Sequence, residues 1–423
     1  MSAAAGDGRT YAAVTAAYWG FTLTDGALRM LVLLHFHALG FTPLDLAFLF
    51  LLYEAMGAVT NLAGGWIGAR FGLRLTLYAG LAVQIVALAA LSAVDQSWTL
   101  ALSVAYVMGA QALSGVAKDL TKMSAKSAVK LVVRDDAGRG QSPLFRMVAL
   151  LTGSKNALKG VGFFLGGLLL QTIGFAPALW AMAGALALVL AASLAFIRGD
   201  LGRAKQKVVR RDLFAKSRPI NLLSAARVFL FAARDVWFVV GVPLFLYDVL
   251  GWRFDQVGAF MALWVIGYGI VQALVPRLLR GARDAGRATA AARGWGLALA
   301  ALPAALAVLL GEAPGSDPAH GAILIGGLFL FGAVFAVNSA LHSYLIVAFS
   351  DADKVALSVG FYYMANAVGR FAGTLLSGLV YQAAGLAACL WASAAMLLIA
   401  AGVAMLIRPA EAAREPGEAV HGE

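Results

Sequence analysis

The sequence predicts an all-α polytopic membrane protein with twelve transmembrane helices in two pseudo-symmetric six-helix bundles. Of its 423 residues, 61% are hydrophobic and 13% are charged, whereas about a quarter of a typical soluble domain is charged. Apolar stretches of about twenty residues, the length at which a helix crosses a bilayer, recur from end to end. The two halves of the chain also match each other at an offset of 211 residues.

We expect twelve spans, separated mostly by short links that contain turn residues. The first link shows the pattern, because it begins with Gly40 and ends with Pro43. The boundaries of the predicted spans are 11–39, 44–69, 75–94, 98–118, 147–173, 177–197, 221–248, 255–276, 289–311, 320–348, 355–384 and 386–408.

Basic residues predict the orientation of these spans, since lysine and arginine accumulate on the cytoplasmic side of a membrane. With the N-terminus in the cytoplasm, 26 of the 33 lysines and arginines fall in cytoplasmic segments or at the cytoplasmic ends of spans, and Arg253 alone falls in an outer link. Both termini are therefore expected to be cytoplasmic. The net charge of +11 then reflects topology rather than binding of nucleic acid.

Two basic segments follow from this topology. The stripe of Lys118, Lys122, Lys126 and Lys130 is expected to lie on acidic lipid headgroups or simply to enforce orientation, or else to attract anionic substrate to the cytoplasmic mouth. The longest loop divides the chain into domains. These are an N-terminal bundle at 1–197, a basic cytoplasmic linker at 198–220, a C-terminal bundle at 221–408 and a cytoplasmic tail at 409–423.

The internal repeat predicts the architecture. Lys159 corresponds to Arg370, and Gly162, Gly167 and Gly174 correspond to Gly373, Gly378 and Gly385. Parallel repeats of six spans, related by an axis along the membrane normal, describe the major facilitator architecture. Substrates of that design bind near the midplane between the two halves.

The link between the second and third spans resembles the signature loop of the major facilitator superfamily. Gly65, Arg70, Gly72 and Arg74 occupy the positions of that loop's glycines and arginines. Ala69 stands where the superfamily usually has an aspartate. The resemblance implies a gating loop that lacks the ion pair made by the aspartate.

Three cations inside the predicted spans suggest a binding function. Lys155 and Lys159 lie one helical turn apart, and Arg370 occupies the place that matches Lys159 in the second half. A cation at bilayer depth costs ~2.5–3.5 kcal/mol even on insertion scales, and like charges at i, i+4 repel. We therefore expect these cations to bind an anionic substrate, with arginine offering bidentate contacts to carboxylate or phosphate. The alternative is that carboxylates from other spans neutralise them.

Further charged residues lie within the first, second and seventh spans. Arg29 and Arg234 are candidate substrate-binding cations. Asp25, Glu54 and Asp235 are the acids expected within the spans, with a role in proton coupling or in charge balance. Because Asp25 lies one turn before Arg29, a local ion pair is a second interpretation for these two residues.

Two expectations concern the seventh span alone. Adjacent helical residues point about 100° apart, so Arg234 and Asp235 are not expected to pair. Arg227 lies near the cytoplasmic end of the span, and we expect its side chain to extend to the headgroups.

Polar side chains on the fifth, tenth and eleventh spans complete the candidate site. Taken singly, each suits a hydrogen bond between helices better than a ligand contact. Taken together, they suit a wet cavity. They are Asn156, His342, Tyr362 and Asn366, with Asn338 and Tyr363 nearby in sequence.

Sequence motifs exclude several other functions. A Walker A motif, a nucleophile elbow and a zinc-protease motif are all absent, so ATP-driven pumping and familiar hydrolase chemistry lose support. Cys389 is the sole cysteine, which excludes an intrachain disulfide and a cysteine metal site. We expect a protein that is not an enzyme and that needs no cofactor or metal.

Several stretches of the chain resemble one family closely. Residues 17–29, 117–124, 155–167 and 233–238 are similar to the organoarsenical efflux permeases of bacterial arsenic-resistance operons (ArsJ type). The resemblance covers nearly all of residues 11–408. It implies an inner-membrane protein that expels 1-arseno-3-phosphoglycerate, an ester that a glyceraldehyde-3-phosphate dehydrogenase makes from arsenate.

The leading hypothesis is a secondary transporter that exports this organoarsenical anion by alternating access and so confers resistance to arsenate. Its expected partners are the small anionic substrate, membrane lipid and, through the pathway, the dehydrogenase. One alternative is a major facilitator transporter of another organic anion, such as a phosphorylated metabolite. A different class is a membrane receptor or scaffold, whose internal cations would be fully neutralised by protein acids.

Overall fold

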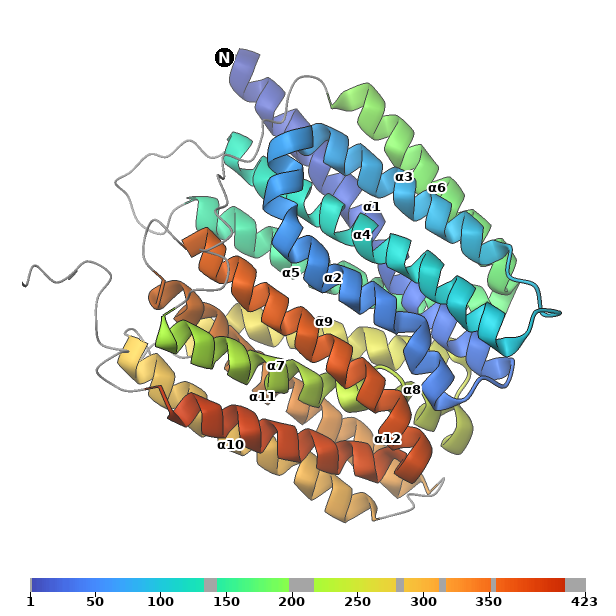
Figure 1. Cartoon of the computed structure of the whole chain (residues 1–423), viewed down its shortest axis with the longest axis vertical. Helices are drawn as coiled ribbons and strands as arrows, with labels where there is room; N and C mark the ends of the chain where they lie inside the picture. The colour runs from blue at the N-terminus through green and yellow to red at the C-terminus, as the bar shows by residue number, and fades with distance from the viewer. Residues whose placement is uncertain are drawn as a thin grey trace, which may run out of the picture. The chain divides into compact units, whose positions relative to one another are not determined.

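A computed structural model describes residues 2–132, 143–197, 217–278, 285–311, 317–350 and 355–407. Within these ranges every regular element is a helix (Figure 1). The helices before residue 198 are α1 (Ser2–Ala38), α2 (Pro43–Phe71), α3 (Leu73–Ser92), α4 (Leu100–Val132), α5 (Pro143–Ile173) and α6 (Phe175–Phe196). Those after it are α7 (Arg218–Phe238), α8 (Gly241–Leu244), the π-helix η2 (Phe245–Val249), α9 (Phe254–Leu278), α10 (Ala285–Leu310), α11 (Pro318–Ala348) and α12 (Val355–Met405).

Helical chain occupies every predicted span, and ten stretches of described helix are long and apolar enough to cross a membrane. One of the ten, Ser358–Met405, contains most of two predicted spans. It lies in α12, where a kink at Ala384 and Gly385 marks the boundary between the two spans. α1 is not among the ten, and it carries the charged residues Asp25 and Arg29. The number of twelve spans therefore stays a prediction.

The helix that contains the fourth predicted span is longer than predicted. The fourth predicted span ends at residue 118, whereas α4 continues to Val132. The added residues are mostly good helix formers such as alanine, lysine and leucine, so the helix can extend beyond the apolar stretch.

The seventh predicted span, 221–248, is broken rather than continuous. Pro243 has no N–H, and its ring clashes with the carbonyl of residue 239 in a regular helix. The hydroxyl of Ser377 on α12 accepts hydrogen bonds from the freed N–H groups of Val240 and Gly241, at 3.0 and 3.3 Å. A break in an apolar helix is tolerated when a neighbouring serine satisfies the backbone in this way.

Equivalent turns recur in the two halves. Gly40 and Gly251, which are 211 residues apart, have φ angles of 87° and 66°. Gly174 and Gly385, related by the same offset, have φ angles of 81° and 72°. Residues with a side chain rarely adopt these left-handed conformations, so glycine is required at each turn. The repeat read from the sequence is thus present in the backbone.

The chain divides into two compact units. Unit 1 comprises Met1–Phe41, Phe48–Lys207 and Trp252–Ile266, and unit 2 comprises Thr42–Ala47, Val208–Gly251 and Gly267–Glu423. The predicted tail and residues 198–216 of the predicted linker lie outside the described residues. The predicted domain boundaries stay predictions.

Glycines allow close helix packing in each unit. In unit 1, a Cβ atom at Gly162 of α5 would lie 2.5 Å from the carbonyl oxygen of Leu23 on α1. In unit 2, a Cβ atom at the equivalent Gly373 of α12 would lie 2.8 Å from the carbonyl oxygen of Ala232 on α7. Both helix pairs therefore approach until backbone meets backbone, as small residues permit in membrane proteins.

We predict that Gly162→Ala destabilises the protein. The added methyl group would force α1 and α5 apart, and overpacking of this kind typically costs about 1–3 kcal/mol. The matched control is Gly184→Ala on α6, since an added Cβ there meets nothing within 4 Å. Thermal unfolding of the purified protein should show a lower Tm for Gly162→Ala and an unchanged or slightly higher Tm for the control. Equal values would contradict the packing argument.

Candidate functional site

An ion pair joins α1 and α2 inside unit 1. The guanidinium of Arg29 pairs with the carboxylate of Glu54, and both side chains are buried. The guanidinium also lies 5.2 Å from the ring centre of Phe50 and 5.4 Å from that of Tyr53. Arg29 is therefore balanced by the next helix rather than by Asp25, which was its alternative partner.

Asp25 instead lies between Tyr53 and Lys159. The hydroxyl of Tyr53 donates a 2.6 Å hydrogen bond to Asp25 Oδ1, and Lys159 Nζ on α5 lies 4.0 Å from Oδ2. The distance to the lysine is at the outer limit of an ion pair. Tyr53 was not among the site residues predicted from the sequence. A single tyrosine in an apolar span does not by itself indicate a binding site.

Lys118 belongs to the same group of side chains. Its Nζ lies 3.9 Å from the ring centre of Tyr53, within reach of a cation–π contact. The expectation that the lysine stripe lies on lipid headgroups is therefore wrong for Lys118. Lys122 is partly exposed and forms a 3.3 Å ion pair with Asp119, so its contact with headgroups stays a prediction. The lysines further along the stripe have side chains outside the described residues.

Lys155 and Asn156 lie one turn before Lys159 on α5, and both are half-buried. The structure thus places the two neighbouring lysines on the same helix as the glycines that pack against α1. We name the group of Asp25, Arg29, Glu54, Lys118, Lys155 and Lys159 the unit 1 cluster.

In unit 2 a single carboxylate serves two arginines. Asp235 has no exposed surface, and its Oδ1 accepts a 2.6 Å hydrogen bond from Arg234 Nε. Its Oδ2 lies 3.5 Å from Nε of Arg370 on α12. The expectation that Arg234 and Asp235 do not pair is wrong. Their Cβ atoms diverge, but the arginine side chain is long enough for its guanidinium to fold back on the adjacent carboxylate.

Arg227, seven residues before Arg234 on α7, is also internal. Its side chain is 4% exposed, and Nη1 donates to the carbonyl and the hydroxyl of Ser339 on α11, at 3.2 and 3.0 Å. Its guanidinium lies 4.1 Å from the ring centre of Phe231 and 4.8 Å from that of Tyr362. The expectation that Arg227 reaches the headgroups is wrong. Tertiary packing against α11 and α12 holds it inside, which its sequence position could not reveal.

The remaining predicted polar residues have different surroundings. His342 and Tyr362 are buried close to Arg227, and Asn366 is half-buried on the same helix as Tyr362. Asn338 on α11 donates a 2.9 Å hydrogen bond to the carbonyl of Ala292 on α10. It therefore makes a hydrogen bond between helices, which is the role expected for each of these residues taken singly. We name the group of Arg227, Arg234, Asp235, His342, Tyr362 and Arg370 the unit 2 cluster.

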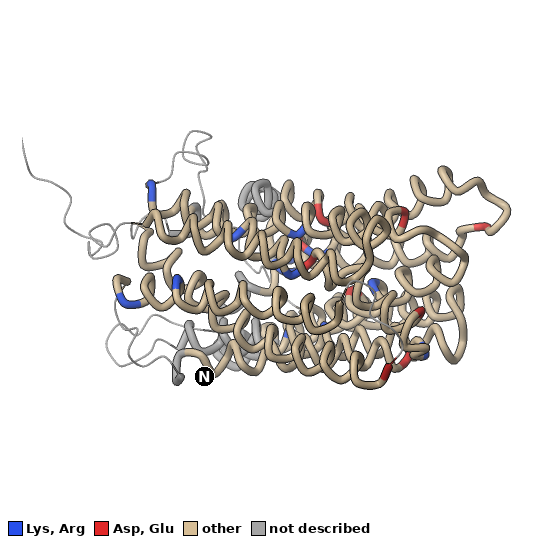
Figure 2. The backbone as a smooth tube through the Cα atoms, turned by 90° about the horizontal axis from the view of Figure 1, so that it is seen from below, with Lys and Arg blue, Asp and Glu red and all other residues tan. Residues whose placement is uncertain are grey.

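Cations exceed carboxylates in both clusters. The unit 1 cluster holds four cationic side chains and two carboxylates, and the unit 2 cluster holds three arginines and one carboxylate. Figure 2 shows charged residues part-way along helices as well as at their ends. Each predicted acid contacts a cation, which favours charge balance over proton coupling as its role. The residual charge of each cluster suits an anionic ligand.

The predicted gating loop is a tight turn. α2 runs to Phe71, Gly72 has a φ of 77°, and α3 begins at the next residue. Arg74 donates a 3.1 Å hydrogen bond from Nε to the hydroxyl of Tyr78 on its own helix. The side chain of Arg70 lies outside the described residues, so the gating role of this loop, Gly65 included, stays a prediction.

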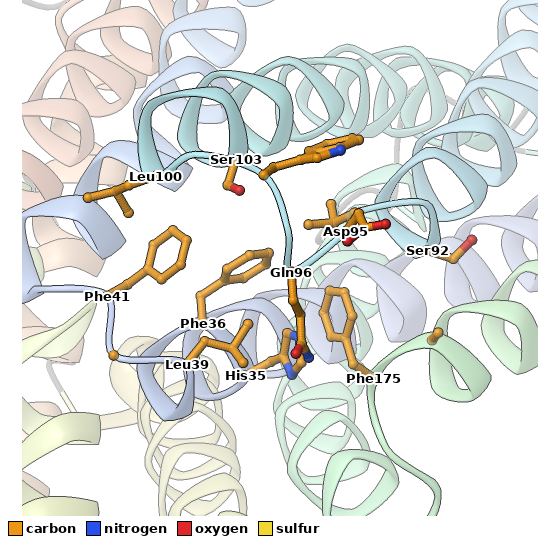
Figure 3. A pocket seen from close by; sticks show the side chains of 14 residues that line it. His35, Phe36, Leu39, Phe41, Ser92, Asp95, Gln96, Leu100, Ser103 and Phe175 are labelled. Atoms are coloured by element: carbon orange, nitrogen blue, oxygen red, sulfur yellow. The ribbon is translucent and has the colours of Figure 1, made fainter.

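A pocket of about 620 Å³ lies in unit 1, away from the cluster residues. Figure 3 shows Phe36, Phe41 and Phe175 around it, with Asp95 on the link between α3 and α4. A backbone hydrogen bond from Ser97 lowers the pKa of Asp95, so its carboxylate stays ionised at neutral pH. An aromatic pocket with a negative charge at its edge does not suit an anion. None of the predicted site residues lines it.

We predict that Asp235→Asn destabilises the protein strongly, because it leaves two arginines in the interior without their carboxylate. Loss of one partner of a buried ion pair typically costs about 3–5 kcal/mol. The double variant Asp235→Asn with Arg370→Gln should recover part of the lost Tm. Asp255→Asn is the control, since its partner Arg253 is 65% exposed and the change should have little effect. A wild-type Tm for Asp235→Asn would contradict the assignment.

No family model matches the sequence, and no curated protein matches it either. Solved structures do match. A mutant of the nucleoside transporter NupG is 14% identical with a TM-score of 0.71, over 94% of this chain and 99% of that chain. A POT family transporter in complex with a thioalcohol-conjugated peptide is 12% identical with a TM-score of 0.70, over 96% of each chain. At such low identity the likeness concerns the fold alone, and this chain has the all-α fold of these two transporters.

Proposed function

We propose that the protein is a secondary transporter that exports 1-arseno-3-phosphoglycerate from the cytoplasm by alternating access. A glyceraldehyde-3-phosphate dehydrogenase would supply this ester from arsenate, and its export would confer resistance to arsenate. The fold supports transport as the class of function. The resemblance of residues 17–29, 117–124, 155–167 and 233–238 to organoarsenical efflux permeases supports the substrate.

The observation that carries the proposal is the excess of cations over carboxylates within the unit 1 cluster and within the unit 2 cluster. Holding a charge away from water costs several kcal/mol in effective terms even after relaxation of the protein. A protein that retains such charges gains if an anion binds beside them. The proposed ester has an arsenate group at one end and a phosphate group at the other, and each unit has a cluster with residual positive charge.

The contacts of the carboxylates suggest how binding would proceed. Lys159 lies 4.0 Å from Asp25, and Arg370 lies 3.5 Å from Asp235, so both cations have loose contacts with their acids. Arg29 and Arg234 pair more tightly. We propose that Lys159 and Arg370 turn to the substrate, while Arg29 and Arg234 set the potential around it. Asp25 and Asp235 would balance the charge when the substrate has left.

Two other functions remain to be separated by experiment. A transporter of another phosphorylated metabolite would use the same cations, since phosphate is common to both ligands. A receptor or scaffold would need its internal cations neutralised by protein acids, and the vesicle assay below separates it from a transporter.

We also propose twelve spans with both termini in the cytoplasm of a bacterial inner membrane, as the distribution of basic residues requires. A reporter fused after residue 423 should be active in the cytoplasm, and one inserted in the outer link beside Arg253 should be active outside. The opposite pattern of reporter activity would reverse the direction that we assign to transport.

We predict that Lys159→Met and Arg370→Met each lower export of the arsenoester by about tenfold or more, because a charge-assisted contact is worth roughly 1.5–3 kcal/mol. The measurement is uptake into inverted membrane vesicles supplied with enzymatically made ester. Arg253→Gln, which removes an exposed cation, is the control and should transport normally.

The same assay separates the alternatives. Unlabelled 3-phosphoglycerate and unlabelled arsenoester can each be added to compete with uptake of the labelled arsenoester. If 3-phosphoglycerate inhibits uptake more strongly than the arsenoester does, another phosphorylated metabolite is favoured as the substrate. Undiminished export by both methionine variants would remove Lys159 and Arg370 from the site. Wild-type vesicles that accumulate none of the organic anions would favour a receptor or scaffold.

A further inference from the structure

Arg227 differs from the other cations of the unit 2 cluster. Arg234 and Arg370 both contact Asp235. No carboxylate among the described residues lies within ion-pair distance of Arg227, although its side chain is buried. Its guanidinium shares the ring of Phe231 with Arg234, at 4.1 and 4.8 Å from the ring centre. Two guanidinium groups beside one aromatic ring repel each other unless a negative charge offsets them.

Buried polar atoms without hydrogen-bond partners lie on α7 itself and on α11 and α12, the helices that contact this arginine. Nε of Arg227 itself makes no hydrogen bond, and neither does Oγ of Ser224, one turn earlier on the same helix face. Nδ1 of the buried His342 and Oδ1 of Asn366 also make none. Buried polar atoms are nearly always paired in folded proteins, so a group of unpaired ones indicates something that binds there.

A purely structural arginine looks different in this chain. Arg293 on α10 directs its donors to the carbonyls of Ala404, Met405 and Ile407, which end α12. The carbonyls of Met405 and Ile407 lie at and just beyond the end of α12, where carbonyls lack partners within the helix. Arg227 uses one nitrogen on Ser339 and leaves Nε unused. Arg293 thus serves as a reference for the structural role.

We propose that Arg227 is the centre of a binding site for a tetrahedral oxyanion, either the phosphate or the arsenate group of the substrate. Nε of Arg227 and the hydroxyl of Ser224 are donors for its oxygens, and a ring N–H at Nδ1 of His342 can also donate. The rings of Phe231 and Tyr362 cover the guanidinium in the described conformation. The anion therefore enters in another state of the alternating-access cycle. This inference rests on the proposed function and assigns one end of its substrate to unit 2.

The test measures thermal unfolding of the purified full chain in detergent with increasing inorganic phosphate, and with chloride at equal ionic strength as reference. The variants are Arg227→Gln, Arg227→Lys and Arg293→Gln. Without phosphate, Arg227→Gln should be as stable as the wild type or more stable, because it removes a buried charge with no carboxylate partner. With phosphate, the wild type should gain stability and Arg227→Gln should not, which corresponds to an affinity lower by about two orders of magnitude.

The two controls define the role of the charge. Arg227→Lys should retain part of the response to phosphate, because it keeps the charge without the guanidinium geometry. Arg293→Gln should lower the Tm without phosphate and keep the full response. An additional arm adds phosphatidylglycerol in place of phosphate, and a response to the lipid alone would assign the site to a headgroup and overturn the proposal.

Two results would overturn the assignment of Arg227 and leave the exporter in place. One is a full phosphate response in Arg227→Gln, and the other is normal vesicle export of the arsenoester by that variant. A large loss of Tm in phosphate-free Arg227→Gln would mark the residue as structural and would also count against the site. Phosphate binding that depends on Arg227 in a wild type that exports no arsenoester would support the oxyanion site while rejecting the proposed substrate.

Discussion

Charges held away from water inside apolar helices constrain this protein more than any other feature. Asp235 shows the constraint most clearly, because it is fully buried and contacts both Arg234 and Arg370. Asp25 and Glu54 have the corresponding role beside Lys159 and Arg29 in unit 1. Without these carboxylates the cations would carry an unfavourable solvation energy of several kcal/mol each. The positions of α1, α5, α7 and α12 are therefore tied to the pairing of their charges.

Close helix packing makes this pairing possible. Gly162 lies three residues after Lys159, and Gly373 lies three residues after Arg370, so each glycine is one turn from the cation of its helix. The glycines let α5 approach α1 and let α12 approach α7 until backbone atoms touch. At that separation a lysine or arginine on one helix reaches an aspartate on the other. The same short segments thus supply both the packing and the electrostatics, which accounts for their correspondence in the two halves.

Aromatic rings also stabilise the internal cations. Tyr53 contacts Arg29 and Lys118 with its ring while its hydroxyl donates to Asp25. Phe231 contacts both Arg227 and Arg234. A cation–π contact away from water stabilises a cation by about 2 kcal/mol. This is less than the several kcal/mol of hydration energy that the cation loses on burial. The rings therefore reduce the energy of the cations and leave their charge in place, as the proposed anion site requires.

The amino-acid sequence determined the helical membrane class, the repeat and the identity of most internal charges, because apolar length, basic bias and recurrent glycines act through local properties of the chain. It also placed the turns at Gly40, Gly174 and their equivalents, where only glycine has the needed φ. Which charges pair was decided by tertiary structure alone. Arg29 contacts Glu54 rather than Asp25, and Arg227 is buried rather than extended to headgroups. These outcomes depend on which helices meet and how far a long side chain can fold back, and neither is encoded in sequence spacing.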